Sequence, residues 1–574
     1  AYRAIIEADR LSLKRFKGHG SAMAQGYGHI IMPLANDRDR RTQVVWGLRD
    51  FEHRFKRKAE GMWLPETAVD VPTLETLAEH GVKFTVLAPR QAKRFRKIGE
   101  KSWTTCENGG IDPRRAYVQR LPSGNEINLF FYDGPVSQAV AFEHLLNSGV
   151  DFSNRLLGSL QDNEKGPQLA HIATDGETFG HHHRHGEMAL SYALQRIEEE
   201  KLGVVTNYSA FLAKHPPQHE VEIEERTSWS CYHGVERWRS DCGCSSGMHP
   251  SWRQRWRKPL REALDWLRDE LAPAYEEVGA EILDDPWEAR DAYIDLILDR
   301  SDENAARFLR RHAKPGLNEV ERGNAIDLLE MQRHAMLMFT SCGWFFDDIS
   351  GIETVEGLQY AGRALQLARD CLNVDLEDEF LRRLEDAPSN IPREANGRLI
   401  YERRVRPTVV DLPAVAAHSA ISSLFEDAES GEHDVYCYQA RQTVERDLHA
   451  GRSRLQVGRI ALRSKISGRE GHFSYAVVHF GDHVVAGGVG PVDTVGPVES
   501  FVSEAELAFK QGGVVELLKL IEEVFGAATY SLGSLFRDQQ REIMSRVLQS
   551  TLSTVRRQYR EIYEEHAPLM RFHA

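Results

Sequence analysis

Short, continuous apolar segments alternate with helical patterns over roughly residues 40–210 of this chain. The apolar segments are GMWLPE (61–66), KFTVLAP (83–89), INLFFYDG (127–134), LAHIATDGE (169–177) and GVVTNY (203–208). An unbroken apolar segment is typical of a strand that is buried on both faces of a parallel sheet. Segments with a helical period lie between them and end at glycines, which commonly stop helices. The pattern therefore predicts an α/β fold of strand–helix repeats, either open or closed into a barrel.

The pattern changes to purely helical between about residues 245 and 385. The apolar positions of its first segment share one face: Leu260, Leu264, Leu267 and Leu271. Such a face predicts a helical bundle packed on the sheet domain. Residues 386–397 (DAPSNIPREANG) follow as a linker rich in Pro, Asn and Gly.

The C-terminal part of the chain predicts a mixture of strands and helices. The segment HFSYAVVHFGDHVVAGGVG (472–490) is typical of a β-hairpin that turns at Gly481-Asp482. Residues 532–565 predict a long helix with an apolar side. We expect three domains: a catalytic (β/α) barrel over 1–230, a helical domain over 231–385 that completes the active-site cleft, and an α+β extension of unknown role over 386–574.

Length and charge narrow the class of protein. A chain of 574 residues is too long for one hydrophobic core. The formal charge of −14 argues against a dedicated nucleic-acid binder, and no apolar run reaches the roughly 18 residues of a membrane helix. The first residues, AYRAIIEADRLSLKRF, predict an amphipathic helix without a signal core. They begin within a pattern, so we expect an N-terminal truncation or a first strand that lies upstream.

The seven cysteines are odd in number and scattered, which does not indicate a disulfide framework and favours a reducing, cytoplasmic location. Cys231, Cys242 and Cys244 could bind zinc with His233 or His249. The Cys-x-Cys spacing differs from the usual two-residue gap, however. The favoured interpretation is free thiols in a packed loop, and we expect no metal and no cofactor.

The segment GMWLPETAVD (61–70) places a carboxylate directly after an apolar strand and a proline. Glu66 has two interpretations. It could lie at the start of the helix that VPTLETLAEHG predicts, together with Thr67 and Asp70, and cap that helix. It could instead be a catalytic group, because chemistry in α/β folds lies at the C-terminal ends of the strands.

The segment HIATDGETFGHHHRHGEMAL (171–190) is the second place where polar groups follow an apolar strand. It could be a solvated strand-to-helix turn. It could also supply Asp175 as the partner of Glu66 in a glycosidase, which needs one carboxyl to protonate the leaving oxygen and a second to stabilise or attack the sugar carbon. In a third interpretation, Asp175 binds a metal with His181 and His185, which would share one helical face, as in sugar deacetylases.

Four segments together resemble glycoside hydrolase family 57. GMWLPE is similar to the strand that the family's catalytic glutamate closes, and TDGETFGHHH (174–183) resembles the later block that carries its aspartate. GHGSAMAQGYGHIIMPLAN (18–36) is similar to the family's second region, with His29 at the histidine position. SCGWFFDD (341–348) is similar to the fifth region. The resemblance covers roughly residues 15–380.

The resemblance implies an incomplete (β/α)7-like barrel, then a helical domain and an α+β C-terminal domain. It implies a retaining enzyme that acts on α-glucans or maltooligosaccharides, of the amylase, 4-α-glucanotransferase or branching type, with Glu66 as nucleophile and Asp175 as acid/base. The carboxyl oxygens of these two residues should then lie within about 8 Å of each other. The sugar site would be shaped by His29, Trp63, Glu177, His181 and Trp344. The alternatives are a metal-dependent polysaccharide deacetylase and a non-catalytic glucan-binding protein.

The chain also departs from the family pattern. The family's first region, a histidine-containing strand, is not in this sequence. Cys342-Gly343 stands where the family has Ser-Asp before Trp344, and His182 stands where branching enzymes often carry Trp. Trp229 and Trp238 flank the polar segment SCYHGVE, which predicts an active-site loop that contacts substrate.

Overall fold

The computed structural model describes residues 1–161, 166–425, 431–481, 484–495, 498–526 and 529–573. The chain divides into two compact units. The first comprises Ala1–Pro315 and Leu328–Thr408, and the second comprises Gly316–Asp327 and Val409–Ala574. The backbone therefore passes between the units three times, after residues 315, 327 and 408. The further division of the first unit near residue 230 stays a prediction.

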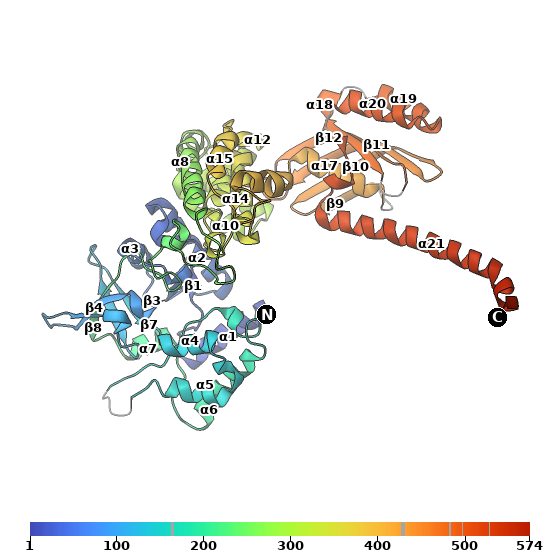
Figure 1. Ribbon diagram of the computed structural model, residues 1–574. Coiled ribbons are helices and arrows are strands. Elements are labelled where there is room, and N and C mark those ends of the chain that lie inside the picture. The colour runs from blue at the N-terminus through green and yellow to red at the C-terminus, as the bar shows by residue number, and fades with distance from the viewer. Residues whose placement is uncertain (162–165, 426–430, 482–483, 496–497, 527–528, 574) are drawn as a thin grey trace. The chain divides into compact units, whose positions relative to one another are not determined.

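The first unit begins with the predicted parallel strand–helix repeats (Figure 1). Strand β1 (Ala24–Gln25) pairs in parallel with β2 (Met62–Trp63), and β3 (Phe84–Leu87) pairs in parallel with β7 (Glu126–Phe131). A parallel bridge between Gly61 and Phe84 joins the two pairs. Helices α2 (Asp37–Phe55) and α3 (Val71–Glu79) connect β1 to β2 and β2 to β3. These elements confirm the α/β class.

The rest of this sheet is mixed. Its strand order is β3-β7-β6-β8-β4-β5. The remaining strands are β4 (Ala92–Lys97), β5 (Thr104–Thr105), β6 (Ala116–Arg120) and β8 (His219–Ile223). β6 runs antiparallel to β7, and β4 runs antiparallel to β8. The strands of the described residues thus form an open arc, as expected for an incomplete barrel.

Two predicted strands are not strands in the structure. Residues 169–175 have no regular secondary structure and no ladder, and Leu169 and His171 each make a single backbone hydrogen bond, to Arg114 and Asp133. Residues 203–207 are irregular and lead into helix α7 (Tyr208–Lys214). The apolar residues of 169–173 still pack on the sheet: Leu169 and Ala173 lie in the cluster around Phe84 and Phe130. Burial alone made these segments look like strands.

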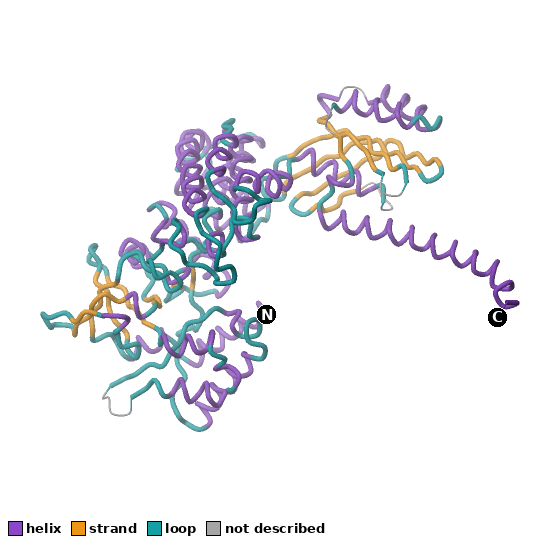
Figure 2. The backbone as a smooth tube through the Cα atoms, in the orientation of Figure 1, coloured by secondary structure: helices purple, strands orange, loops and turns teal. Residues whose placement is uncertain are grey.

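Helices, joined by loops, make up most of the remaining regular structure of the first unit (Figure 2). Those of its first part are α1 (Tyr2–Arg15), α4 (Gly134–Phe142), α5 (Gly149–Leu157) and α6 (Gly186–Glu199). The later ones are α8 (Arg257–Ile282), α9 (Pro286–Ala292), α10 (Ile294–Leu298), α11 (Asp302–His312), α13 (Cys342–Phe345), α14 (Ile352–Leu372), α15 (Glu377–Glu385) and α16 (Gly397–Ile400). Helix α12 (Glu319–Leu337) spans the passage at residue 327. The predicted apolar face of α8 is buried throughout, from Leu260 to Leu271.

The second unit is an antiparallel sheet with helices on both faces. Its strands, in sheet order, are β14 (Thr529–Tyr530), β13 (Val485–Pro491), β12 (Glu470–His479), β11 (Ser453–Ser464), β10 (Tyr438–Ala450) and β9 (Gly431–Val435). Its helices are α17 (Leu412–Ser423), α18 (Val492–Val495), α19 (Val498–Lys510), α20 (Val514–Phe525) and α21 (Arg537–His573). Adjacent residues of β12 face opposite cores: Val477 packs with α17, and Val478 packs with α19 and α20.

The predicted hairpin and C-terminal helix are both present in this unit. β12 pairs antiparallel with β13, with Val477 opposite Gly487, while Asp482 of the predicted turn lies outside the described residues. The long helix is α21, in which Ile543 is fully buried but Val555, Tyr559 and Ile562 are exposed. Within the described ranges, every helix is too short or too polar to span a membrane.

Candidate active site

Glu66 lies on a short 3-10 turn, Pro65–Thr67, immediately after strand β2. Its backbone is left-handed, with φ 57° and ψ 18°, and Thr67 follows with φ 50°. This conformation costs a residue other than glycine about 1–2 kcal/mol. Such strain persists where surrounding contacts enforce it. The backbone N–H of Trp229 enforces it here by donating to the Glu66 carbonyl at 3.0 Å.

The Glu66 carboxylate is held by two donors from one loop. Its Oε2 accepts a hydrogen bond from the indole Nε1 of Trp229 at 3.0 Å and another from the hydroxyl of Ser230. Helix α3 is capped by a different residue, because Asp70 accepts from the backbone N–H of Thr73 at 2.9 Å. The helix-cap interpretation of Glu66 is therefore wrong, and its carboxylate is instead oriented by distant side chains.

A buried amide supports the turn from below. Gln91 is fully buried. Its Oε1 accepts from the hydroxyl of Thr67 and the backbone N–H of Ala88, both at 2.8 Å. Its Nε2 donates to the Thr67 carbonyl at 2.8 Å and to the Thr227 hydroxyl at 3.2 Å. Gln91 thus ties the Glu66 turn to the end of β3 and to the chain leading to Trp229. Sequence patterns gave no signal for this residue.

His29 joins the N-terminal segment to the segment before α13. Its Nδ1 lies 2.7 Å from the Ser341 hydroxyl, and its carbonyl accepts from the Ser341 backbone N–H at 2.9 Å. The next residue, Cys342, lies near Glu66. Burial of the Cys342 thiol, and then the negative charge of Glu66, raise the pKa of this thiol. The two segments that resemble the family's second and fifth regions are thus in contact with each other.

Asp175 precedes a 3-10 turn, Gly176–Thr178, and its side chain is exposed and caps nothing. Partial desolvation by the surrounding protein, and then the charge of Glu177, raise the pKa of Asp175, while His182 and His29 act in the opposite direction. His29 therefore lies in electrostatic range of Asp175, and its partner segment at Ser341–Cys342 lies in range of Glu66. A carboxyl with a raised pKa is suited to donate a proton.

The histidine cluster does not have the predicted helical arrangement. Residues 179–185 form turns, and α6 begins only at Gly186, so His181 and His185 do not share a helical face. His181 and His182 are exposed, with ring centroids 5.2 Å apart, and His185 has a left-handed backbone with φ 67°. Asp175, His181 and His185 do not gather as potential metal ligands among the described residues. The geometry thus gives the deacetylase interpretation no support.

The predicted tryptophans fall into two groups. Trp63 and Trp229 are half-buried and meet edge to face, with ring centroids 5.2 Å apart, beside the Glu66 carboxylate. Trp238 and Trp344 are each only 1% exposed, and their indole N–H groups donate to backbone carbonyls of Ser341 and Arg257. The expectation that Trp238 and Trp344 contact sugar directly is therefore corrected, because packing covers both faces of these rings.

Comparison with known proteins agrees with the fold. The family described as glycosyl hydrolase family 57 matches residues 15–224, and a domain of unknown function, DUF3536, matches residues 252–536. The exo-type maltose-forming amylase of Pyrococcus sp. ST04 is similar in structure, with a TM-score of 0.53 at 14% identity over 72% of this chain and 78% of that one. No curated protein sequence matches the chain.

Two further solved structures show weaker similarity. The GH57-type branching enzyme of Pyrococcus horikoshii has a TM-score of 0.40 at 16% identity, over 70% of this chain and 72% of that one. The 4-α-glucanotransferase of Thermococcus litoralis has a TM-score of 0.39 at 12% identity, over 84% of this chain and 77% of that one. Residues 15–224 of the chain, which include Glu66 and Asp175, are similar to glycosyl hydrolase family 57.

Proposed function

We propose that this chain is a retaining glycoside hydrolase or transglycosylase that acts on α-glucans, with Glu66 as the nucleophile and Asp175 as the acid/base. The observation that carries the proposal is the fixed Glu66 carboxylate, which follows β2 in the family motif and accepts hydrogen bonds from Trp229 and Ser230. The names of the similar solved structures, an amylase, a branching enzyme and a glucanotransferase, support an α-glucan substrate.

The first step assigns a separate role to each carboxyl. Asp175, in its acid form, gives its proton to the glycosidic oxygen as the bond to the anomeric carbon breaks. Glu66 attacks that carbon from the opposite face and forms a glycosyl ester. The N–H of Trp229 and the hydroxyl of Ser230 hold the Glu66 carboxylate in one orientation before the attack, so that little reorganisation is needed.

The second step reverses these roles. Asp175 is now a carboxylate and takes a proton from water or from a sugar hydroxyl, which attacks the anomeric carbon and releases Glu66. Water as acceptor gives hydrolysis, and a glucan hydroxyl gives transfer or branching. The half-buried rings of Trp63 and Trp229 supply apolar faces beside Glu66 that suit a sugar ring. His29, Glu177 and His181 would supply the polar contacts.

The experiment traps the nucleophile. The chain is incubated with a maltooligosaccharyl fluoride that carries fluorine at the 2-position, digested, and analysed by mass spectrometry. We expect one glycosyl adduct, on the peptide that contains Glu66, and proton NMR of early products should show the anomeric configuration of the substrate. Inverted products would exclude the retaining mechanism. Binding of maltooligosaccharides without cleavage or adduct would instead make the chain a glucan-binding protein.

A further inference from the structure

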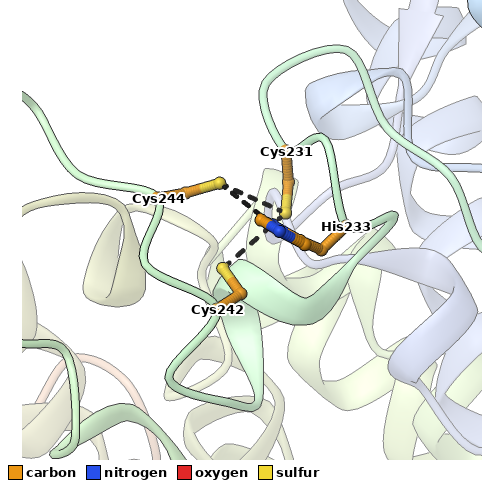
Figure 3. Close-up of side chains that lie close together, drawn as sticks. All are labelled: Cys231, His233, Cys242 and Cys244. Carbon is orange, nitrogen blue, oxygen red and sulfur yellow. Dashed lines mark hydrogen bonds between the residues drawn. The ribbon is translucent and has the colours of Figure 1, made fainter.

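Three cysteines and one histidine converge on the loop that follows the donors to Glu66. The ligand atoms of Cys231, His233, Cys242 and Cys244 all lie within 4.8 Å of one another. They come from two short segments, Cys231-x-His233 and Cys242-x-Cys244. Figure 3 shows the three sulfur atoms and the imidazole ring turned toward one another. His249, the alternative ligand suggested by sequence, instead stacks on Trp252 at 3.9 Å between ring centroids.

Three of the six ligand-to-ligand distances in this cluster match the edges of a tetrahedral zinc site, and all six are within 4.8 Å. Zinc–sulfur bonds of about 2.3 Å and zinc–nitrogen bonds of about 2.0–2.1 Å give edges of about 3.8 Å between sulfur atoms and about 3.6 Å between sulfur and nitrogen. The Cys231 sulfur lies 3.9 Å from that of Cys242 and 3.8 Å from that of Cys244. The Cys244 sulfur lies 3.6 Å from Nδ1 of His233.

These distances do not describe a disulfide. A sulfur–sulfur bond measures about 2.05 Å, whereas the Cys231 sulfur is almost equally far from two others, at 3.9 and 3.8 Å. Thiolates with one imidazole form a soft donor set that suits Zn²⁺. Among the described residues, this is the one group of His, Cys, Asp and Glu side chains close enough to hold a metal ion.

The backbone of the cluster is fixed from both sides. Arg90 donates from Nη2 to the carbonyls of Ser228 and Cys231, at 2.7 and 3.2 Å. The fully buried Arg257 donates from Nη1 to the Cys244 carbonyl at 2.7 Å. Groups that orient the ligand-bearing backbone are typical of metal sites, where they lower the cost of bringing the ligands together.

We propose that Cys231, His233, Cys242 and Cys244 bind one structural Zn²⁺ ion, which fastens the loop that presents Trp229 and Ser230 to Glu66. Four protein ligands leave no open position for water or substrate, so the ion has no part in bond cleavage. Cys231 follows Ser230 directly in the chain, so the ion would anchor the residue next to the donor. Any effect of the ion on turnover rests on the proposed role of Glu66, whereas the metal site itself does not.

The test measures metal content independently of activity. The full-length chain is purified under reducing conditions, and its zinc is counted by elemental analysis. We expect about one zinc per chain. We also expect that Co²⁺, substituted for zinc, shows the strong visible bands of a tetrahedral site and the thiolate charge-transfer band. Failure of the reduced, folded chain to take up either zinc or cobalt would overturn the proposal, as would a disulfide among the three cysteines in that chain.

Variants separate this site from other cysteines. Cys242→Ser and Cys244→Ser should each lower zinc affinity by more than about tenfold and weaken the cobalt–thiolate charge-transfer band from the intensity of three sulfur ligands to that of two. His233→Ala changes an exposed position, so this variant should still fold, and it should also weaken zinc binding. Cys106→Ser, outside the cluster, should retain full zinc. Unchanged zinc affinity in Cys242→Ser and Cys244→Ser contradicts the proposal. A zinc-loaded chain without glycosidase activity would instead contradict only the proposed function.

Discussion

The indole N–H of Trp229 donates to the carboxylate of Glu66 at 3.0 Å, and the backbone N–H of the same residue donates to the Glu66 carbonyl at 3.0 Å. One residue, 163 positions away in the chain, thus holds both the side chain and the main chain of the proposed nucleophile. The left-handed backbone of Glu66 is understandable on this basis, because two bonds from Trp229 enforce it.

Removing the indole donor should slow catalysis. Trp229→Phe keeps an aromatic ring against Trp63 but loses the bond to Glu66, and a hydrogen bond to a charged group contributes about 1.5–3 kcal/mol. We expect kcat on a maltooligosaccharide to fall about 10–100-fold, with a smaller change in KM. The matched control is Trp287→Phe, which loses an indole bond to the exposed Glu276 carboxylate and should leave kcat unchanged. Equal effects of the two substitutions would refute the positioning role.

Glu66 and Asp70 should respond in opposite ways to substitution. Glu66→Gln keeps an acceptor oxygen for Trp229 and Ser230, so the melting temperature should stay within a few degrees, while activity falls by several orders of magnitude. Asp70→Ala removes the N-cap of α3 and should lose about 1 kcal/mol of stability with activity kept. Thermal denaturation and glucan cleavage assays check both. Normal turnover by Glu66→Gln would end the glycosidase assignment.

The pH dependence of kcat/KM should report the acid form of Asp175. Its raised pKa keeps the proton to higher pH, and activity is lost as the pH rises through that pKa. Glu177→Gln removes a charge that raises the pKa of Asp175, so the alkaline limb should move to lower pH. His182→Gln removes a charge that lowers it, so the limb should move to higher pH. Shifts of the same sign in both variants would contradict this arrangement.

Gln91 should stabilise the turn that carries Glu66. Gln91→Leu leaves the hydroxyl and carbonyl of Thr67 and the N–H of Ala88 without their partner, and unpaired buried groups destabilise by about 1–3 kcal/mol each. We expect a lower free energy of unfolding in urea. At a temperature where the variant is folded, kcat should also fall while KM changes little.

The control for this prediction is another buried glutamine. Gln254 is 2% exposed, and its side-chain nitrogen, Nε2, has no hydrogen-bond partner among the described residues. Gln254→Leu should therefore be close to neutral or stabilising. A loss of stability and kcat as large as that of Gln91→Leu would show that burial of leucine, rather than the lost bonds, causes the effect.

The sequence predicted the parts of the site that are local in the chain. The apolar strand, Pro65 and Glu66 are adjacent, so their motif was visible, and so was the helical period of α3 and α8. The contact between Trp229 and Glu66 is long-range, and no spacing rule reports it. For segment 169–175 the sequence predicted a strand that is absent, because its apolar residues pack on the sheet without joining a ladder. Periodicity reports burial but does not report hydrogen-bond partners.

The usual spacing rule for cysteine ligands does not apply to the cysteine cluster. A two-residue gap suits ligands on a tight turn. Here Cys242-x-Cys244 supplies two ligands from an irregular segment, in which Gly243 has φ 81°, and Cys231-x-His233 supplies the other two from a separate segment. The sequence separation between these pairs carries no geometric information, so only the fold could select His233 over His249. The distance between the Glu66 and Asp175 carboxyls stays a prediction.

The passage of the chain between the two units has a practical consequence for shortening the protein. Residues 316–327 belong to the second unit, where Asp327 pairs with Arg469 at 3.1 Å. A polypeptide that ends at Thr408 would still contain this segment, stripped of the sheet that receives it, and would expose it to proteases. Limited proteolysis of such a fragment should begin there, and the first unit cannot be separated from the second by a single cut.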